Sequence, residues 1–194
     1  MKVVLFNGSA RKNGVTNAAL NIVMKELKAE GIDVELIWMG FDNLSGCNAC
    51  YECLRTQDKQ CVIKTDKMND YIAKIIEADG IIIGSPTHFA NVSTRIKALI
   101  DRAGLVGLVN GNLYKHKVGA AVIAARRAGA VHVFSSINYF FLTNQMHVIG
   151  SNYYNLGINP NIMNPMNFEN DEEGNETLKI LGKNMAYVIK KLKS

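Results

Sequence analysis

The sequence predicts an α/β fold in which a five-stranded parallel sheet carries helices on both faces. Five short runs are rich in apolar, mostly β-branched residues, and the first of them, residues 3–6, is apolar at every position, which is typical of a strand buried on both faces. The segments between these runs repeat apolar residues every three or four positions, as helices that cover a sheet do. Strands and helices therefore alternate along the chain, and this order favours one parallel sheet.

A polar loop separates the first predicted strand from the first predicted helix. Residues 3–6 form the apolar strand, and a loop that contains Gly8 and Gly14 follows at once. From Thr16 the period changes to that of a helix ending near Gly31. The apolar face of this helix consists of Leu20, Val23, Met24 and Leu27.

The later elements continue the alternation. We expect the other four strands at residues 34–38, 81–84, 118–123 and 147–150. Helices are expected at about residues 66–78, 93–103 and 131–146, with a C-terminal helix whose apolar face contains Leu178, Leu181, Met185, Val188 and Leu192. Residues 152–174 are rich in Asn and include Pro160 and Pro165, so we expect a long irregular excursion there.

One domain is sufficient for a chain of this length. The sequence has 194 residues and no internal repeat or interdomain linker, so we expect a single domain over residues 1–194 with a cysteine loop at about residues 40–65. The hydrophobic fraction of 48% is typical of a soluble globular protein. The apolar run at the N-terminus is too short for a signal peptide, and no run reaches the roughly 20 apolar residues of a membrane span. We expect a cytoplasmic protein with no membrane partner.

The formal net charge of +5 is spread along the chain. Lys and Arg are not gathered with aromatic residues into a stripe, so we expect no nucleic-acid partner. Long-range attraction by a basic protein still favours small anionic ligands such as phosphates.

The loop between the first strand and the first helix is a candidate phosphate site. In an open α/β sheet, ligands bind beyond the carboxyl ends of the strands, where a helix N-terminus offers unpaired N–H groups and positive partial charge. Hydroxyls, an amide, a glycine and an arginine are all present in this loop, and they suit one phosphate group. The candidate residues are Ser9, Arg11, Asn13, Gly14, Val15, Thr16 and Asn17.

The glycine spacing of this loop argues against two common nucleotide-binding motifs. It matches neither Gly-x-Gly-x-x-Gly nor Gly-x-x-x-x-Gly-Lys-Ser/Thr, so dinucleotide-binding and NTPase functions lose their main support. The alternative to a phosphate site is that Ser, Asn and Gly only build a turn and cap the helix, with Thr16 as the N-cap.

Three segments resemble known flavoproteins. Residues 8–16 (Gly-Ser-x-Arg-x-x-Gly-x-Thr) resemble the corresponding loop of the NADPH-dependent FMN reductase and iron-sulfur flavoprotein families. Residues 84–89 (Gly-Ser-Pro-Thr-His-Phe) resemble the loop that these families place along the isoalloxazine ring, and residues 95–102 follow it as in the families. Residues 124–129 resemble the loop that closes over the other side of the flavin, although Ala stands at positions 124, 125 and 128, where members often have Gly. The resemblance covers most of the chain and implies a flavodoxin-like fold that binds FMN.

By this resemblance, two loops would contact the flavin ring. One wall would consist of Pro86, Thr87, His88 and Phe89, and the other side would be closed by Ala125, Arg126, Arg127 and Gly129. Alternatives remain for individual residues. His88 could be a surface histidine, and the two arginines could bind a nicotinamide phosphate or belong to a solvated loop.

All four cysteines lie within 15 positions of one another, at Cys47, Cys50, Cys53 and Cys61. A disulfide framework would spread them to close long loops. Three thiols at three-residue spacing can converge on one centre, and the eight-residue step to the fourth spans up to roughly 26 Å, so that cysteine can return as a ligand. The spacing resembles the compact motif of the iron-sulfur flavoproteins, which implies a [4Fe-4S] cluster on these four residues. It differs from the common ferredoxin run, and a tetrahedral zinc or four unmetallated thiols are the alternatives.

The resemblance implies an FMN-dependent oxidoreductase that exchanges electrons between flavin and cluster. NAD(P)H or a ferredoxin would be the donor, a small molecule a possible acceptor, and the assembly a homodimer or homotetramer. No catalytic acid or base is expected. The alternatives are an NAD(P)H-dependent FMN, quinone or nitroaromatic reductase without a cluster, a non-catalytic flavodoxin-like electron carrier, and a zinc-stabilised binding module without flavin.

Overall fold

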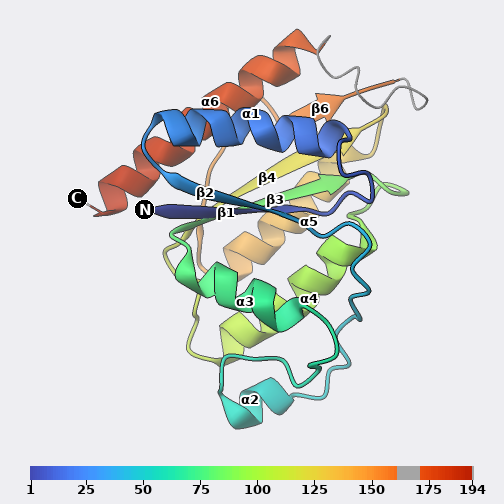
Figure 1. Cartoon of the computed structure of the whole chain (residues 1–194), viewed down its shortest axis with the longest axis vertical. Coiled ribbons are helices and arrows are strands. Elements are labelled where there is room, and N and C mark those ends of the chain that lie inside the picture. Colours follow the sequence, from blue (N-terminus) through green and yellow to red (C-terminus); the bar gives the residue numbers. More distant parts are fainter. Residues whose placement is uncertain (161–170, 194) are drawn as a thin grey trace.

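A parallel sheet runs through the centre of the computed structural model, which describes residues 1–160 and 171–193. Over these residues the sheet has six strands in the order β2-β1-β3-β4-β5, with β6 also paired to β4 (Figure 1). The strands are β1 Lys2–Asn7, β2 Asp33–Trp38, β3 Gly80–Pro86, β4 Val118–Ala125, β5 His147–Val148 and β6 Leu156–Ile158.

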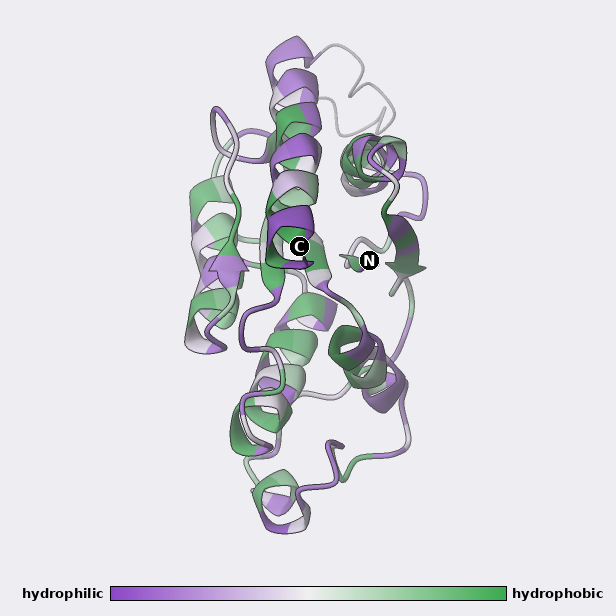
Figure 2. Cartoon of the chain, turned by 90° about the vertical axis from the view of Figure 1, so that its left-hand side faces the viewer, coloured by the Kyte–Doolittle hydropathy of each residue, from purple (hydrophilic) through white to green (hydrophobic). Residues whose placement is uncertain are grey.

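Helices cover both faces of this sheet, as the sequence predicts. Helices α1 (Val15–Ala29) and α6 (Glu172–Lys193) lie on one face, and α3 (Met68–Glu77), α4 (Thr94–Val109) and α5 (Ala130–Thr143) lie on the other (Figure 1). A short helix, α2 (Glu52–Thr56), lies apart from these layers at the foot of the molecule, where Figure 2 also places it.

The pleat of β1 explains why its sequence is apolar without alternation. Val3 and Leu5 are fully buried in the cluster formed with α1 and α6, whereas Val4 and Phe6 are fully buried in the cluster formed with α3, α4 and α5. Because successive side chains point to opposite faces, a strand between two helical layers needs an apolar residue at every position.

Helix α1 begins one residue before the expected start and is capped differently. Gly14 is the N-cap, with extended backbone and no side-chain cap, while Thr16 lies within the first turn and is buried. The alternative that Thr16 caps the helix is therefore wrong. The predicted apolar face is confirmed, since Leu20, Val23 and Leu27 are fully buried.

The fifth position of the sheet differs from the prediction. Two short strands share it: β5 pairs with the start of β4 at Val118 and Gly119, and β6 pairs with its end from Ile123 to Ala125. Strand β6 lies in the segment expected to be irregular, because a three-residue strand among Asn residues gives no periodic signal. Of that segment, residues 161–170 lie outside the described residues, and α6 begins within it at Glu172.

Helix α4 is longer than predicted, and it ends at Val109. Glycines at positions 104 and 107 would ordinarily signal its end. Here Gly107 is a packing site instead, because a methyl group at this position would overlap the ring of the fully buried Tyr114.

None of the helices described in residues 1–160 and 171–193 combines the length and the apolar character that crossing a membrane requires.

Candidate functional site

A pocket of about 420 Å³ opens at the carboxyl edge of the sheet. From β1 the chain proceeds to β2 on one side and then crosses to β3 on the other, so the loops after β1 and β3 diverge at this edge (Figure 1). Ligands of open α/β sheets bind at such a switch point. The pocket walls come from three loops, which follow β1, β3 and β4, together with one residue after β6.

The loop after β1 is shaped by its own polar side chains. The Ser9 N–H donates to Asn7 Oδ1 at 3.0 Å, and Asn7 Nδ2 donates to Asn17 Oδ1 at 3.2 Å. Ser9 Oγ accepts the Arg11 N–H at 3.1 Å, and the Trp38 indole N–H donates to the Ser9 carbonyl at 2.8 Å. These bonds fix the backbone between β1 and α1, so Asn17 holds the loop rather than lining the pocket.

The N-terminus of α1 leaves unpaired hydrogen-bond donors at the pocket. Val15 and Thr16 line it, and their backbone N–H groups have no hydrogen-bond partner within the described part of the chain. Gly14 lies beside them, where an added Cβ would come within 3.1 Å of the Arg11 Cβ. Free amides and the positive end of a helix dipole together favour an anion.

Most predicted residues of this loop line the pocket: Ser9, Arg11, Gly14, Val15 and Thr16. Ala10 lines it as well, whereas Asn13 is exposed and does not.

The loop after β3 forms a second wall through Pro86, Thr87 and His88. The Thr87 N–H donates to the Ala124 carbonyl at 2.8 Å, which joins this wall to the end of β4. Thr87 Oγ1 is buried and has no hydrogen-bond partner among the described residues. A ligand group in the pocket could satisfy it.

Phe89 is not part of this wall. Its side chain is fully exposed, and it lies in a tight turn with positive φ angles of 48° at Phe89 and 57° at Ala90. Two backbone hydrogen bonds of 2.9 Å between His88 and Asn91 close this turn.

The loop after β4 supplies Ala124, Ala125 and Arg126, and the sequence prediction missed a neighbour, Asn159. Asn159 follows β6, its N–H donates to the Ala125 carbonyl at 2.9 Å, and its side chain is buried against the pocket. No local pattern marks it, because only the pairing of β6 with β4 brings it to this edge. Arg127 is exposed and does not line the pocket.

Gly129 shapes the site without lining it. It is the N-cap of α5 in the left-handed conformation, with φ +84°. An added Cβ would lie 2.9 Å from the Ala90 Cα and 3.3 Å from the Thr87 Cγ2, so glycine lets the start of α5 press against the turn after β3.

The charge at the pocket is positive. Arg11 and Arg126 are exposed at its walls, and among the described lining residues there is no carboxylate. Its size falls in the usual range for cofactor sites. An apolar wall next to free amides and two arginines suits a flat ligand that carries a phosphate.

A second candidate site gathers the four cysteines. They all line one small cavity of about 20 Å³ between the segment after β2 and helix α4. Cys47 and Cys50 are exposed, Cys53 is buried, Cys61 is half-buried, and all four thiols are free. Within the described residues, however, no group of three or more His, Cys, Asp or Glu side chains is arranged to hold a metal ion.

The environment of the thiols includes N–H donors to sulfur. The Ala49 N–H donates to Cys47 Sγ at 3.4 Å, and Arg102 Nε donates to Cys61 Sγ at 3.3 Å. Burial raises the pKa of the Cys53 thiol, and the three neighbouring cysteines raise it further.

The two sites are separated along α4. This helix starts at Thr94, close to the turn after β3, and Arg102 at the cysteine cavity lies eight residues further on. At 1.5 Å per residue this is about 12 Å along the helix. The segment between β2 and α3 therefore leaves the carboxyl edge of the sheet and carries the cysteines away beneath α4 (Figure 1).

Comparison with known proteins agrees with this geometry. The family described as NADPH-dependent FMN reductase matches residues 1–160. An iron-sulfur flavoprotein of Methanocaldococcus jannaschii is 34% identical over 200 residues, covering 100% of this chain and 100% of the relative. An iron-sulfur flavoprotein of Methanosarcina thermophila is 32% identical over 191 residues, covering 97% of this chain and 95% of the relative.

A solved structure supports the fold. The flavodoxin-type, WrbA-like protein of Agrobacterium tumefaciens superposes with a TM-score of 0.69 over 98% of this chain and 97% of its own, at 16% identity. The predicted α/β fold is thus confirmed as flavodoxin-like. The chain belongs to the NADPH-dependent FMN reductase family and, within this flavodoxin-like superfamily, to the iron-sulfur flavoproteins, and it is an FMN-dependent oxidoreductase.

Proposed function

We propose that FMN binds in the pocket at the carboxyl edge of the sheet and that the chain uses it to transfer electrons. The observation that carries this proposal is the pair of unpartnered amides at Val15 and Thr16, in the pocket wall beside Gly14. They would bind the phosphate together with Ser9 and Arg11, while Asn17 would support the loop through its hydrogen bond with Asn7. Asn13 is exposed outside the pocket wall. The relatives' family name points to the same cofactor.

The flavin ring would lie between the loops after β3 and β4. Pro86, Thr87 and His88 would contact one side, and Ala125 and Arg126 the other. The unpartnered Thr87 Oγ1 is a hydrogen-bonding group available to the ring edge. Phe89, Arg127 and Gly129 would act through the shape of these loops.

Bound FMN would supply the chemistry, since flavin accepts electrons in pairs and releases them singly. The chain's own part is to position the ring, to hold the phosphate by helix α1, and to exclude water with the apolar wall. We infer no acid or base among its residues.

We further propose that Cys47, Cys50, Cys53 and Cys61 hold a [4Fe-4S] cluster that exchanges electrons with the flavin. The residues fit this group in the chemistry of their donors: four thiols line one cavity, and two of the sulfurs accept N–H hydrogen bonds. A cluster distributes its cysteines over separate irons, so they need not converge on one point as zinc ligands do. The cavity of about 20 Å³ has room for about one water and must widen on loading.

Iron, sulfide and flavin assays on protein purified without oxygen test both proposals. We expect about four irons and one FMN per chain, with iron lost and FMN retained in Cys50→Ser. FMN without iron would refute the cluster, and protein without flavin would refute the pocket assignment.

The second candidate function is an NAD(P)H-dependent FMN, quinone or nitroaromatic reductase without a cluster. It is favoured by the match to the NADPH-dependent family over residues 1–160 and by the cysteine arrangement, which forms no metal site in the described residues. It predicts NAD(P)H-driven turnover that Cys→Ser changes leave unaltered. A non-catalytic flavodoxin-like carrier would instead turn over slowly with every small-molecule acceptor.

The partners follow from the same proposal. NAD(P)H or a ferredoxin would reduce the protein, a small molecule could be the acceptor, and the protein would act in the cytoplasm. A homodimer or homotetramer is supported by the apolar residues exposed on the outer face of α5, which are Val131, Tyr139 and Leu142. Assembly could also bring the cysteine centre of one subunit nearer to the flavin of another.

A further inference from the structure

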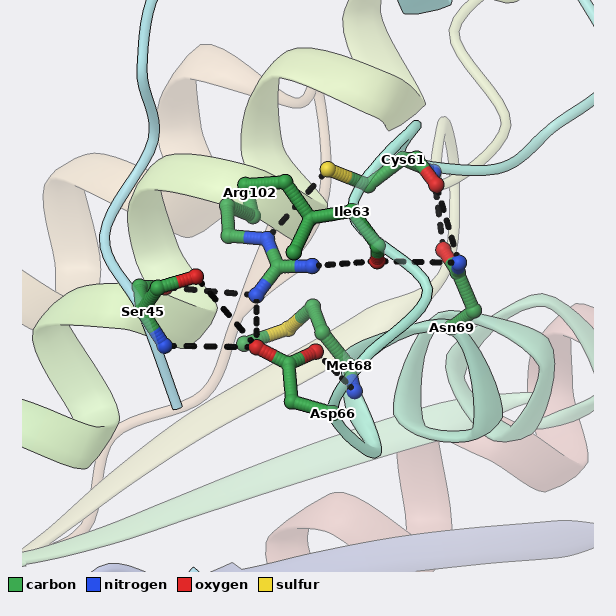
Figure 3. A network of polar contacts seen from close by, with 7 residues as sticks. All are labelled: Ser45, Cys61, Ile63, Asp66, Met68, Asn69 and Arg102. Atoms are coloured by element: carbon green, nitrogen blue, oxygen red, sulfur yellow. Dashed lines mark hydrogen bonds and ion pairs between the residues drawn. The ribbon is translucent and has the colours of Figure 1, made fainter. Parts of the chain in front are cut away.

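A buried arginine attaches the cysteine segment to helix α4. Arg102 is 1% exposed and is the largest fully buried side chain in the described part of the chain. A guanidinium stays charged at every relevant pH, so its burial requires partners in fixed positions. Figure 3 shows that its nitrogens point toward the segment between Ser45 and Asp66.

The donors of Arg102 reach both ends of this segment. Nη1 donates to the Ser45 carbonyl at 3.2 Å and forms an ion pair with Asp66. Nη2 donates to the Ile63 carbonyl at 3.0 Å, and Nε donates to Cys61 Sγ at 3.3 Å (Figure 3). One planar group therefore fixes the chain before the first cysteine and after the last, and it also contacts a sulfur directly.

Asp66 is held as firmly as its partner. Its Oδ2 accepts the Ser45 N–H at 3.2 Å, and its Oδ1 accepts the Met68 N–H at 3.1 Å, where α3 begins (Figure 3). The carboxylate balances the charge of Arg102 without contacting the thiol, so the hydrogen bond to Cys61 comes from a paired and immobile cation.

The four cysteines are therefore not equivalent. The Asn69 side chain brackets Cys61, accepting its N–H at 2.8 Å and donating to its carbonyl at 2.9 Å (Figure 3). Cys53 is tied to α4 through its carbonyl, which accepts from Asn110 at 3.2 Å. Cys47 and Cys50 are exposed and lie on a segment without regular structure. Cys61 is the ligand position that the fold prepares most completely.

We propose that Arg102 is a positioning residue of the redox centre, which fixes Cys61 Sγ and raises the reduction potential of the cluster by aiming a charged N–H at that sulfur. This inference rests on the proposed function. Hydrogen bonds to cluster sulfurs stabilise the more electron-rich, reduced state and so raise the potential. A rigid fork with five donors can serve Asp66, two carbonyls and a sulfur at once, which a lysine ammonium cannot.

Arg102→Lys tests the proposal, because it keeps the charge beside Asp66 but loses the bond to sulfur. The cluster potential is measured by anaerobic spectroelectrochemistry, with the FMN potential of the same sample as reference. We expect the cluster potential to fall by about 59 mV, which corresponds to a tenfold shift of the one-electron equilibrium toward the oxidised cluster. The FMN potential should be unchanged. The matched control is Asn69→Ala, which removes the backbone bonds of Cys61 and leaves Arg102 in place. We expect it to lose iron faster without a shift in potential.

A second readout needs no cluster. In iron-free protein, alkylation followed by mass spectrometry ranks the reactivity of the thiols, which depends on their exposure and on their thiolate fraction. We expect the exposed Cys47 and Cys50 to react first. Arg102→Lys should raise the alkylation rate of Cys61 relative to Cys53. If the variant does not fold, Arg102→Gln combined with Asp66→Asn keeps the buried site neutral and replaces it in both experiments.

The outcomes separate the two proposals. An unchanged cluster potential together with unchanged alkylation of Cys61 would overturn the role of Arg102. Wild-type protein that binds FMN but no iron would refute the cluster. The alkylation experiment alone would then decide whether Arg102 positions Cys61.

Discussion

Gly129 allows the sharpest test of how the loop after β4 fits against the turn after β3. Alanine at this position must adopt φ +84°, a left-handed conformation that costs an L-residue about 1–2 kcal/mol. Its Cβ would also lie 2.9 Å from the Ala90 Cα and 3.3 Å from the Thr87 Cγ2. The first of these contacts is with backbone, so the turn must move, and such overpacking costs about 1–3 kcal/mol. We therefore expect Gly129→Ala to lower the free energy of unfolding by about 2–5 kcal/mol.

The chain offers a matched control for the backbone strain. Gly111 has φ +86°, and an added Cβ there meets nothing within 4 Å. Gly111→Ala should therefore lose only the conformational part, about 1–2 kcal/mol. Urea unfolding of FMN-free protein measures both losses, and their difference isolates the contact with the turn after β3.

Flavin affinity supplies the functional half of this test. Thr87 and His88 lead into this turn and line the pocket, so its displacement should weaken FMN binding about tenfold in Gly129→Ala, equivalent to about 1.4 kcal/mol. The FMN affinity of Gly111→Ala should be unchanged. Fluorescence titration of FMN gives both dissociation constants. Equal unfolding losses within about 0.5 kcal/mol, together with equal FMN affinities, would refute the reasoning.

Three further predictions concern single side chains. Thr16→Val keeps the buried shape of the side chain but removes a hydroxyl from the pocket wall. By titration FMN should bind about tenfold more weakly, with little change in the free energy of unfolding. An unchanged FMN affinity would show that Thr16 does not belong to the phosphate site. Burial opposes ionisation of Asp66, but hydrogen bonds from Arg102 and from the Met68 and Ser45 amides hold its pKa below the usual range. The stability it contributes is therefore complete above about pH 4 and is lost as the pH falls through the folded pKa. Asp66→Asn should lose about 3–5 kcal/mol at neutral pH and show a shallower acid decline in urea unfolding, and a decline as steep as that of the wild type would contradict this assignment. Thr177 Oγ1 is buried without a partner in the described residues, so Thr177→Val should stabilise the protein by up to about 1 kcal/mol in the same assay. A clear loss of stability would contradict this prediction.

The sequence was sufficient for the fold wherever burial leaves a periodic pattern. Strand β1 lies between two helical layers and is therefore apolar at every position, and α1 shows its buried face at helical spacing. Strand β6 escaped prediction because three residues make no period, and α2 because five residues make little more than one turn. Helix α4 extends beyond the predicted residue 103 to Val109, and within this extension Gly107 accommodates the Tyr114 ring rather than ending the helix.

The candidate sites could also be predicted only in part from the sequence. The loop after β1 could be predicted because one continuous stretch carries its pocket residues, whereas Asn159 reaches the pocket only through the pairing of β6 with β4. The role of Arg102 was not visible either. Its partners lie at least 36 positions away in sequence, and an arginine is ordinarily exposed, so only the folded structure reveals that it is buried against Cys61.

A crystal structure of the chain with FMN bound tests the central claim most directly. We predict that the phosphate accepts hydrogen bonds from the Val15 and Thr16 amides, with the ring between the wall of Pro86 to His88 and the loop at Ala125 and Arg126. A flavin bound elsewhere, or a phosphate that leaves both amides unpaired, would contradict the account.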